Sequence, residues 1–538
     1  MASKSIIKHQ ITRSHKLATA QQQTALKTAA QAALRSYGQG HAAAAEAAIE
    51  KIFAIDPDQP DALHLKGLMA LNGKDYQTAE ACFSQAVTLQ PVFPLAHYNR
   101  GNGFLETRQY LRAEASYLKA IDQLADFPEA CGNLGLTYMM LGDDAKAIAY
   151  LTRTIALKPD FTHALNNMGN VLRRQGRPME AAAFYNKAII SAPGFALGYN
   201  NLGNVLRDLG QLDKAIAAFR RARDLDPELA EAPYNLALAL LLTGDFAAGW
   251  EGYRWRHQIP GGPPAARQFS QPPWDGGDVS GKTLYLYPEQ GLGDTIQFCR
   301  YVPLVAQRGG KIILRVPADL DALLTSLAGV DSMVLETEPG PETFDVHASL
   351  LDLPRIFATD QDTIPWSGPY LGVGEKQAAV WADRIRADRG LRVGLVWAGN
   401  AGHENDRNRS MDPRILAPLS RIDGITLHSL QIGSGNQAKA LFGDAIVDLA
   451  PWIRDWSDTA AAIRNLDLMI SVDTSSAHLA GAMGSEVWTL LPYMPDWRWQ
   501  LDRDDSPWYP TMRLFRQTAI GDWDSVVQRL VTALENRL

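Results

Sequence analysis

The repeat that decides the fold is clearest in residues 161–194, FTHALNNMGNVLRRQGRPMEAAAFYNKAIISAPG, and in residues 195–228, FALGYNNLGNVLRDLGQLDKAIAAFRRARDLDPE, which follow directly. The same 34-residue step relates four series of positions along the first half of the chain. They are the prolines Pro57, Pro91, Pro159, Pro193 and Pro227; the glycines Gly67, Gly101, Gly135, Gly169 and Gly203, then Ala237; the alanines Ala45, Ala79, Ala113, Ala147, Ala181 and Ala215, then Gly249; and the large residues Ile49, Phe83, Tyr117, Leu151, Tyr185, Phe219 and Tyr253. Four series in phase predict a stack of identical units.

This pattern resembles the tetratricopeptide repeat (TPR), in which two helices touch at small residues and a proline follows the second helix. A glycine inside the first helix lowers helix propensity, and we expect it where any side chain would hold the helices apart. We predict six full repeats from about Leu26 to Ala230 and a seventh that degrades after Tyr253. The fold class is therefore an α superhelix over residues 26–256, preceded by a polar leader, residues 1–25.

Asparagine recurs in phase with the repeats, at Asn99, Asn133, Asn167, Asn201 and Asn235, and partly at Asn102, Asn170 and Asn204. Asparagine is a mediocre helix former, so its repetition needs a reason. Its amide offers one acceptor and two donors, which suits pairing with the backbone of a bound peptide. This ladder resembles that of the O-GlcNAc transferases, whose repeats hold extended acceptor peptides, and the first five residues are the predicted acceptor-binding set. The alternative is that they brace the helices of each repeat.

A second architecture follows a Pro/Gly-rich linker, residues 257–280. Apolar runs alternate there with helical stretches, which is typical of βαβ units and predicts an α/β domain of two Rossmann-like halves, residues 281–375 and 376–538. The expected strands are Thr283–Tyr287, Lys311–Val316, Arg392–Trp397, Thr426–Leu430, Leu468–Val472 and Val487–Leu491.

Three polar motifs come at predicted strand ends. In YLYPEQGLGDTIQ, Gly291 and Gly293 form a tight turn before a helix that opens at Asp294, which either acts chemically or caps that helix. In LMISVDTSSAHLAG, Asp473, Thr474, Ser475 and Ser476 lead into a helix that carries His478. The positive end of that helix suits a phosphate, although a simple cap is the alternative.

The third motif, LVWAGNAGHENDRNRSM, places Asn400, His403, Arg407, Arg409 and Ser410 in one loop. Two arginines beyond a strand end suit phosphate oxygens, while the alternative is a solvated surface loop. Gln431, directly after the strand expected at Thr426–Leu430, joins the predicted donor-binding set.

Together the three motifs resemble the metal-independent GT-B glycosyltransferases of the ADP-heptose:lipopolysaccharide heptosyltransferase type. The resemblance implies that Asp294 is the catalytic base. It also implies that Asp473, Thr474, Ser475 and His478 bind the donor and that Arg407 or Arg409 replaces a donor-contacting lysine. The full predicted donor-binding set is Gly291, Gly293, Asn400, Arg407, Arg409, Ser410, Gln431, Asp473, Thr474, Ser475, Ser476 and His478. A lysine usually stands in that family where this chain has Arg407 and Arg409, which leaves the donor sugar open. Repeats before such a domain resemble bacterial flagellin glycosyltransferases, which attach a nonulosonic acid to serine or threonine.

The composition is that of a soluble protein, with 46% hydrophobic and 21% charged residues and a net charge of -7. That charge predicts no general attraction to nucleic acid or to an anionic membrane. The three cysteines, Cys82, Cys131 and Cys299, form neither a disulfide framework nor a zinc motif. We find no secretion signal and no membrane-length apolar run, so we expect a cytoplasmic protein without membrane insertion.

The leading hypothesis is an inverting protein O-glycosyltransferase that needs no metal and no cofactor. Its co-substrate would be a nucleotide sugar, and its partner an acceptor protein, with flagellin as one candidate. Two alternatives remain open. One is a TPR adaptor whose sugar-nucleotide domain is inactive, and the other is a lipopolysaccharide heptosyltransferase.

Overall fold

The computed structural model describes residues 20–259, 261–262, 269–385, 390–402, 405–433 and 437–538. The chain divides into two compact units, Met1–Val205 and Leu206–Leu538. Most of the predicted leader lies outside the described residues, but helix α2 begins at Ala20, so residues 20–25 are helical. Among the described residues no helix is both long enough and apolar enough to cross a membrane.

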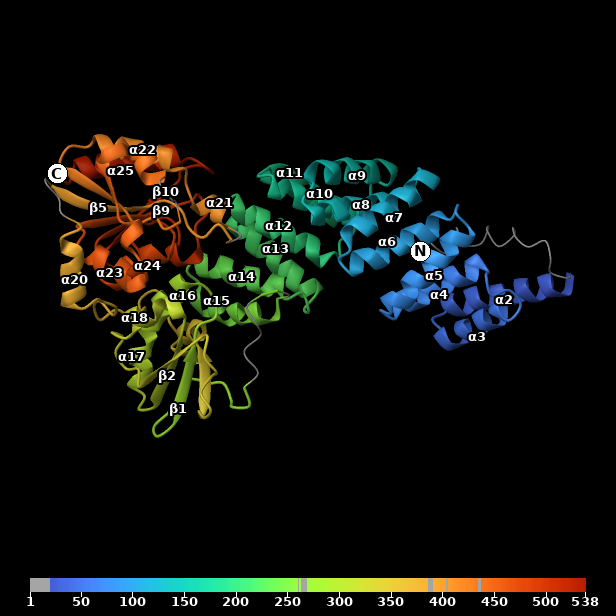
Figure 1. Cartoon of the computed structure of the whole chain (residues 1–538), viewed down its shortest axis with the longest axis horizontal. Coiled ribbons are helices and arrows are strands. Elements are labelled where there is room, and N and C mark those ends of the chain that lie inside the picture. The colour runs from blue at the N-terminus through green and yellow to red at the C-terminus, as the bar shows by residue number, and fades with distance from the viewer. Residues whose placement is uncertain (1–19, 260, 263–268, 386–389, 403–404, 434–436) are drawn as a thin grey trace. The chain divides into compact units, whose positions relative to one another are not determined.

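The first unit is built from antiparallel helix pairs (Figure 1). They are α2 (Ala20–Gly38) with α3 (Ala42–Phe53), α4 (Pro60–Asn72) with α5 (Tyr76–Leu89), α6 (Pro94–Glu106) with α7 (Tyr110–Gln123), α8 (Pro128–Leu141) with α9 (Asp144–Leu157), and α10 (Thr162–Arg174) with α11 (Pro178–Ser191). Helix α12 (Ala196–Asp208) contains the division between the units, and α13 (Leu212–Leu225), α14 (Glu231–Leu242) and α15 (Phe246–Tyr253) belong to the second unit.

The periodic residues do what their positions predict. A methyl group added at Gly101 would lie 2.6 Å from the ring of Tyr117, and one at Gly169 would lie 2.5 Å from the ring of Tyr185. Both distances are shorter than any real contact, so the large residue of the second helix occupies the space that glycine leaves. The expectation that these glycines permit close helix contact is confirmed.

The turns inside the pairs also repeat. Gly142, Gly176, Gly210 and Gly244 have φ between 73° and 89°, which only glycine adopts at no cost. Acidic N-caps then begin several second helices. For example, the side chain of Asp143 accepts a hydrogen bond of 3.0 Å from the amide of Lys146.

The second unit contains two sheets in which every strand pairing is parallel. The first has the order β3-β2-β1-β4, from β1 (Thr283–Tyr287), β2 (Lys311–Val316), β3 (Ser332–Leu335) and β4 (Val346–Ser349). The second has the order β10-β9-β8-β5-β6-β7, from β5 (Leu391–Val396), β6 (Ile425–Ser429), β7 (Ile446–Asp448), β8 (Leu468–Val472), β9 (Val487–Leu491) and β10 (Met512–Arg516). Counted along the chain, this second order is that of a doubly wound nucleotide-binding sheet.

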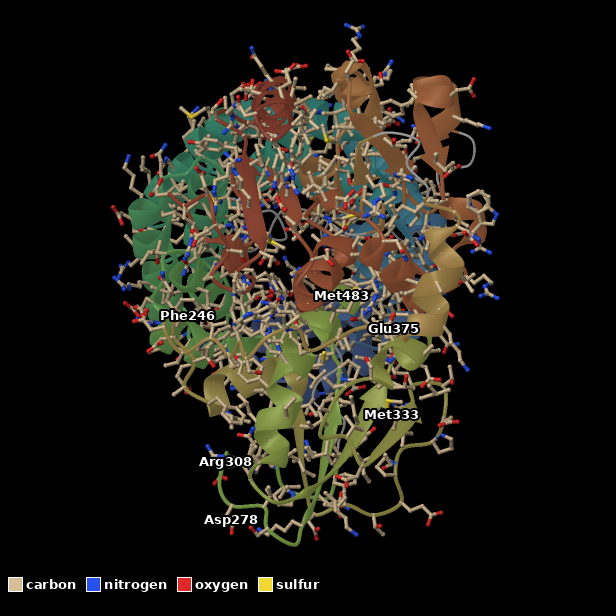
Figure 2. All side chains as sticks on the ribbon, turned by 90° about the vertical axis from the view of Figure 1, so that its left-hand side faces the viewer. Phe246, Asp278, Arg308, Met333, Glu375 and Met483 are labelled. Carbon is tan, nitrogen blue, oxygen red and sulfur yellow. The ribbon has the colours of Figure 1, made fainter. Side chains whose placement is uncertain are left out.

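Short helices connect these strands. They are α16 (Leu292–Phe298), α17 (Val302–Ala306), α18 (Asp321–Leu324), α19 (Leu353–Ile356), α20 (Glu375–Ala382), α21 (Asp406–Arg409), α22 (Gln437–Phe442), α23 (Trp456–Arg464), α24 (Ser475–Ala482) and α25 (Trp523–Glu535), with the 3-10 turns η2 (Arg254–Gln258) and η9 (Trp497–Trp499). In Figure 2, Asp278 and Arg308 mark the edge of the first sheet at which β1 and β2 begin. The predicted polar motifs follow strand ends, so they lie at the opposite, carboxyl edges.

One continuous apolar core joins the two sheets to α14 and α15. It includes Leu241, Trp250 and Tyr253 from the helices, Leu286 from β1 and Leu491 from β9, all buried. The seventh helix pair therefore packs as part of the α/β unit.

Candidate functional site

The turn after β1 brings Asp294 to the carboxyl edge of the first sheet. Its Oδ2 atom accepts a hydrogen bond of 3.0 Å from the amide of Gly291, so the carboxylate closes the first turn of α16. One oxygen of Asp294 therefore caps the helix, as the capping alternative expects. The other oxygen, Oδ1, pairs with the guanidinium of Arg498.

The turn after β8 lies against the start of α16. A methyl group added at Gly293 would lie 3.3 Å from Ser475 Oγ and 3.1 Å from His478 Cδ2, so the glycine permits this close approach. Thr474 is the N-cap of α24 but makes no side-chain capping hydrogen bond. The first amides of α24 therefore have no cap from the Thr474 side chain, close to where α24 packs against α16.

The loop after β5 folds onto itself. Ser410 Oγ accepts a hydrogen bond of 2.9 Å from the amide of Gly399 and donates one of 2.8 Å to Asp406. Asp406 also pairs with Arg409, at 3.4 Å from its Nε atom. Gly399 lets Arg409 pass, since a methyl group there would lie 2.8 Å from Arg409 Nη2.

The other predicted donor residues differ in their placement. Arg409 is mostly buried, whereas Arg407 and Asn400 are exposed, and Asn400 accepts a turn hydrogen bond of 2.9 Å from the amide of Gly402. Gln431 braces the loop: its Oε1 accepts from the amides of Trp397 and Ala398 at 3.0 and 2.9 Å. His403 lies outside the described residues.

The second sheet reverses its strand order between β5 and β8, and these two motifs follow those two strands. Ligands of doubly wound sheets bind at that reversal point. The structure therefore brings Arg409, Asp473, Ser475 and His478 to the place where such a sheet holds its ligand. Asp294 from the first sheet joins them across α16 and α24, which pack together.

Three arginines affect the ionisation of His478. Its pKa is held well below the usual value, first by burial and then by the charges of Arg498, Arg300 and Arg409. His478 is therefore neutral, and its Nε2 atom, 4.0 Å from Asp473 Oδ1, forms no ion pair there. Its Nδ1 atom lies 2.9 Å from the hydroxyl of Tyr509.

Asp473 is a mostly buried carboxylate at the end of β8. Burial, followed by the charge of Asp496, raises the pKa of Asp473 to about 6, although Arg409 and Arg498 oppose the shift. Carboxylates with raised pKa values cluster at functional sites.

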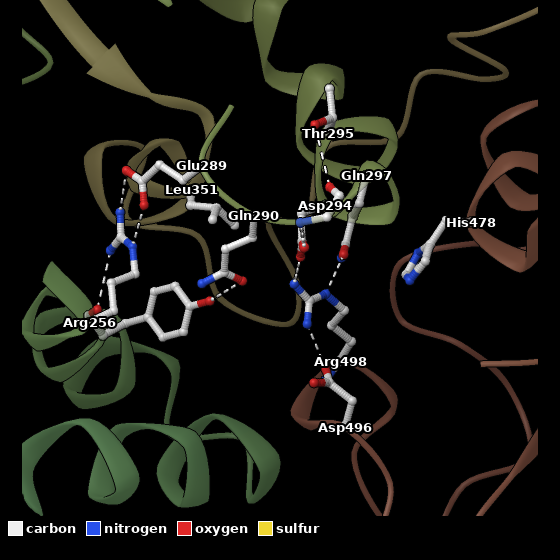
Figure 3. A network of polar contacts seen from close by, with 12 residues as sticks. Arg256, Glu289, Gln290, Asp294, Thr295, Gln297, Leu351, His478, Asp496 and Arg498 are labelled. Carbon is white, nitrogen blue, oxygen red and sulfur yellow. Dashed lines mark hydrogen bonds and ion pairs between the residues drawn. The ribbon is translucent and has the colours of Figure 1, made fainter. Parts of the chain in front are cut away.

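The sequence-based hypothesis missed the segment after β9, LLPYMPDWRWQ, residues 490–500. It supplies Arg498, whose Nη1 lies 2.8 Å from Asp496 and whose Nε lies 2.6 Å from Gln297 Oε1 on α16 (Figure 3). A signal existed in the sequence, because this segment follows a predicted strand just as the three chosen motifs do.

A second polar cluster lies beside this network. Arg256 is 1% exposed and donates to Glu289 at 2.8 Å and to Asp352 at 2.9 Å. His257, Glu289 and Asp352 are close enough to one another to hold a metal ion. The guanidinium of Arg256 pairs with both carboxylates, so we interpret this cluster as an ion-pair network.

The asparagine ladder connects consecutive repeats. Asn133 on α8 donates to Asn102 on α6 at 2.9 Å, and Asn201 on α12 donates to Asn166 on α10 at 2.9 Å. Asn99 Nδ2 lies 2.8 Å from His64 Nε2. These contacts favour the bracing interpretation, while Asn167 and Asn235 are half-buried at the same repeat position. Acceptor binding by the ladder stays a prediction.

Comparison with known protein families identifies the helical part. Residues 28–94, 71–130, 98–160, 133–194 and 184–217 match families described as "Tetratricopeptide repeat", and residues 203–244 match a family described as "TPR repeat". The helix pairs up to about residue 250 form a TPR solenoid.

One curated relative extends past the repeats. The chain is 26% identical over 340 residues to "Protein FlbA" of Caulobacter vibrioides, a match that covers 57% of this chain and 56% of FlbA. That share of the chain exceeds the solenoid, so the match includes residues outside it. The chain spans little more than half the length of FlbA.

Two solved structures are similar to part of the chain. The chain resembles PilF of Pseudomonas aeruginosa with 19% identity and a TM-score of 0.36, covering 39% of this chain and 96% of PilF. It resembles YrrB, described as a TPR protein with an unusual peptide-binding site, with 21% identity and a TM-score of 0.30, covering 34% of this chain and 95% of YrrB.

Proposed function

We propose that this chain is an inverting, metal-independent protein O-glycosyltransferase whose two parallel-sheet halves form a GT-B domain. One observation carries the proposal. The carboxylate of Asp294, the uncapped start of α24 and Arg409 come from three separate strand ends and converge near the strand-order reversal. A transfer reaction needs these three groups, which are a base, an anion-binding helix end and a cation.

The reaction uses them in one displacement. Asp294 takes the proton of an acceptor hydroxyl, and the hydroxyl oxygen bonds to the anomeric carbon from the face opposite the nucleotide. The bond between that carbon and the phosphate oxygen breaks, and its electron pair leaves with the nucleotide. The amides at Ser475 and the guanidinium of Arg409 stabilise the negative charge that develops on the departing phosphate.

The acceptor is a protein held by the TPR solenoid. TPR arrays present long concave surfaces, and an asparagine amide offers both donors and an acceptor that suit the backbone of a bound peptide. Flagellin in the cytoplasm, modified with a nonulosonic acid on serine or threonine, is the acceptor that the family resemblance suggests.

The adaptor alternative is favoured by one specific observation. Both oxygens of Asp294 are engaged, by the Gly291 amide and by Arg498, as expected of a purely structural residue. A lipopolysaccharide heptosyltransferase would account for the α/β unit and leave the solenoid without a role.

Calorimetry with CMP, UDP, ADP and GDP tests the donor site. We expect one nucleotide to bind the full chain, and Asp294→Asn to bind it equally well. In the same variant, transfer to the acceptor should fall by about 100- to 10,000-fold, the usual contribution of a positioned base. Intact-mass spectrometry of flagellin from cells with and without the protein identifies the product.

A variant of the asparagine ladder tests acceptor binding separately from the reaction of the donor. Replacing Asn99, Asn133 and Asn201 together with serine should raise the KM for the acceptor and leave hydrolysis of the donor unchanged. If no nucleotide binds, or if Asp294→Asn transfers sugar at the normal rate, the transferase proposal fails and the adaptor alternative gains.

A further inference from the structure

The 3-10 turn η9 places an arginine against α16. Arg498 is 9% exposed, and its guanidinium lies 4.4 Å from the ring centre of Trp497 and 5.6 Å from that of Phe298. A charge buried this deeply needs partners for its N–H groups. The identity of those partners indicates what the residue does.

Each of the three guanidinium nitrogens of Arg498 has a partner. Nη2 pairs with Asp294 Oδ1, Nε donates to Gln297 Oε1 at 2.6 Å, and Nη1 donates to Asp496 Oδ1 at 2.8 Å. Asp294 and Gln297 are three residues apart on α16, so they project from one face of that helix. Figure 3 shows both side chains pointing at Arg498, with Asp496 on its other side.

These contacts leave Asp294 little rotational freedom. One oxygen is held by the Gly291 amide of its own turn and the other by Arg498, which comes from a segment 204 positions away in the sequence. A catalytic carboxylate must be held in a productive orientation by its neighbours.

We propose that Arg498 is the positioning residue of the transfer reaction, which holds Asp294 ionised and oriented toward the acceptor hydroxyl. This inference rests on the proposed function, in which Asp294 receives the acceptor proton. It assigns a role to the segment after β9 that neither the motifs nor the family resemblance supplies.

The charges of Asp294, Asp496 and Arg498 suit the chain both before and after Asp294 accepts the proton. Burial disfavours the charged form of Arg498, but Asp496 and Asp294 outweigh that effect and raise its pKa, so the guanidinium stays charged. When Asp294 accepts the proton, it loses its negative charge, and Arg498 keeps only Asp496 as an anionic partner. The group formed by Asp294, Asp496 and Arg498 thereby gains one unit of net positive charge just as the nucleotide phosphate becomes more negative.

Asp294 and the start of α24 are close enough for a change of charge at one to affect the other. Gly293, next to Asp294, approaches Ser475 at the start of α24 so closely that a methyl group would lie 3.3 Å from its Oγ atom. The proton acceptor and the predicted phosphate site are therefore neighbours. Electrostatic interactions between buried groups over such short distances are weakly screened by solvent.

The test compares Arg498→Met, Arg498→Lys and the control Arg503→Met in the full chain. Arg503 lies three residues beyond the segment after β9 and pairs with Asp505 and Gln500. An opposite charge within contact distance shifts carboxylate ionisation by about 1 to 3 pH units. In Arg498→Met the acid limb of the kcat/KM profile should therefore move up by at least one pH unit. Arg498→Lys should keep the wild-type limb but lower kcat, because an ammonium cannot hold all three partners.

A second measurement does not depend on turnover. Carbodiimide labelling of Asp294, followed by mass spectrometry across pH, reports its ionisation directly. We expect half-maximal labelling to move to higher pH in Arg498→Met and to stay in place in Arg503→Met. An unchanged labelling curve in Arg498→Met overturns the positioning role, whatever the activity. A shifted curve in a chain that transfers no sugar with any nucleotide sugar instead overturns the proposed function alone.

Discussion

The carboxylate of Asp473 should make the folded chain less stable at neutral pH than it would be with a neutral side chain there. Its pKa is raised from 3.8 to about 6, first by burial and then by the charge of Asp496. The folded chain therefore binds this proton more tightly than the unfolded chain does. The free energy of unfolding therefore falls as pH rises from 3.8 to about 6, and it stays lower at higher pH.

The size of the effect follows from the shift. One pKa unit corresponds to about 1.4 kcal/mol, so the ionised carboxylate of Asp473 costs about 3 kcal/mol at pH 8 and about 1.5 kcal/mol at pH 5. Asp473→Asn removes this cost and should be more stable than the wild type by these amounts. At about 2 °C per kcal/mol, its melting temperature should rise by about 6 °C at pH 8 and by about 3 °C at pH 5.

Asp467, at the other end of β8, is the matched control. Its pKa is lowered by hydrogen bonds to Arg392, so its carboxylate stabilises the fold above its unfolded pKa. Asp467→Asn should therefore lower the melting temperature at pH 8, in the opposite direction. Scanning calorimetry of both variants and the wild type at the two pH values provides the measurement. An Asp473→Asn variant that melts at or below the wild-type temperature at pH 8 would refute the electrostatic reasoning.

Three further outcomes are expected. Gly169→Ala should lower the stability of the solenoid by about 1–3 kcal/mol, because its methyl group would lie 2.5 Å from the Tyr185 ring; thermal unfolding followed by circular dichroism measures this. Arg256→Met should destabilise the second unit by about 3–5 kcal/mol in calorimetry, because it leaves two carboxylates without their cation; an unchanged melting temperature would contradict the buried network. Arg409→Ala should weaken nucleotide binding by about tenfold or more in titration calorimetry, whereas exposed Arg407→Ala should change it little; equal losses would return Arg407 to the donor site.

The sequence predicted the interior of both sheets and none of their edges. Each of the six expected strands is an inner strand, whereas β3, β4, β7 and β10 are the four edge strands. Inner parallel strands are covered on both faces and appear as continuous apolar runs, as in β8, where every residue is buried. Edge strands such as β3, with no buried residue, and β7, with one, are short and partly exposed, so their composition resembles that of loops.

The parts of the candidate site that lie within single sequence motifs were predictable. Strand ends followed by glycine, hydroxyl and arginine residues led to Asp294, Ser475 and Arg409, because parallel strands present their carboxyl ends at one edge. The pairing of Asp294 with Arg498 joins two segments 204 residues apart, and no local pattern encodes it. A similar limit applies to Gln431, whose side chain braces a neighbouring strand end through two backbone amides.

The fading of the repeat pattern in the seventh helix pair has a physical cause in the packing of α14. Alanine replaces the glycine of the first helix at Ala237, and glycine replaces the alanine of the second at Gly249, where a methyl group would lie 2.6 Å from Leu241. Glycine and alanine have thus changed places between the two helices, while the large position is kept by Tyr253. Helix α14 is apolar on most of its surface, since Leu236 and Leu240 pack against α13 while Leu241 and Leu242 join the core shared with both sheets. A helix between two apolar partners needs hydrophobic residues at most of its positions, although α14 keeps the in-phase Asn235. The degenerate repeat is therefore the point at which the solenoid becomes part of the α/β unit, and its altered sequence is the signature of that junction.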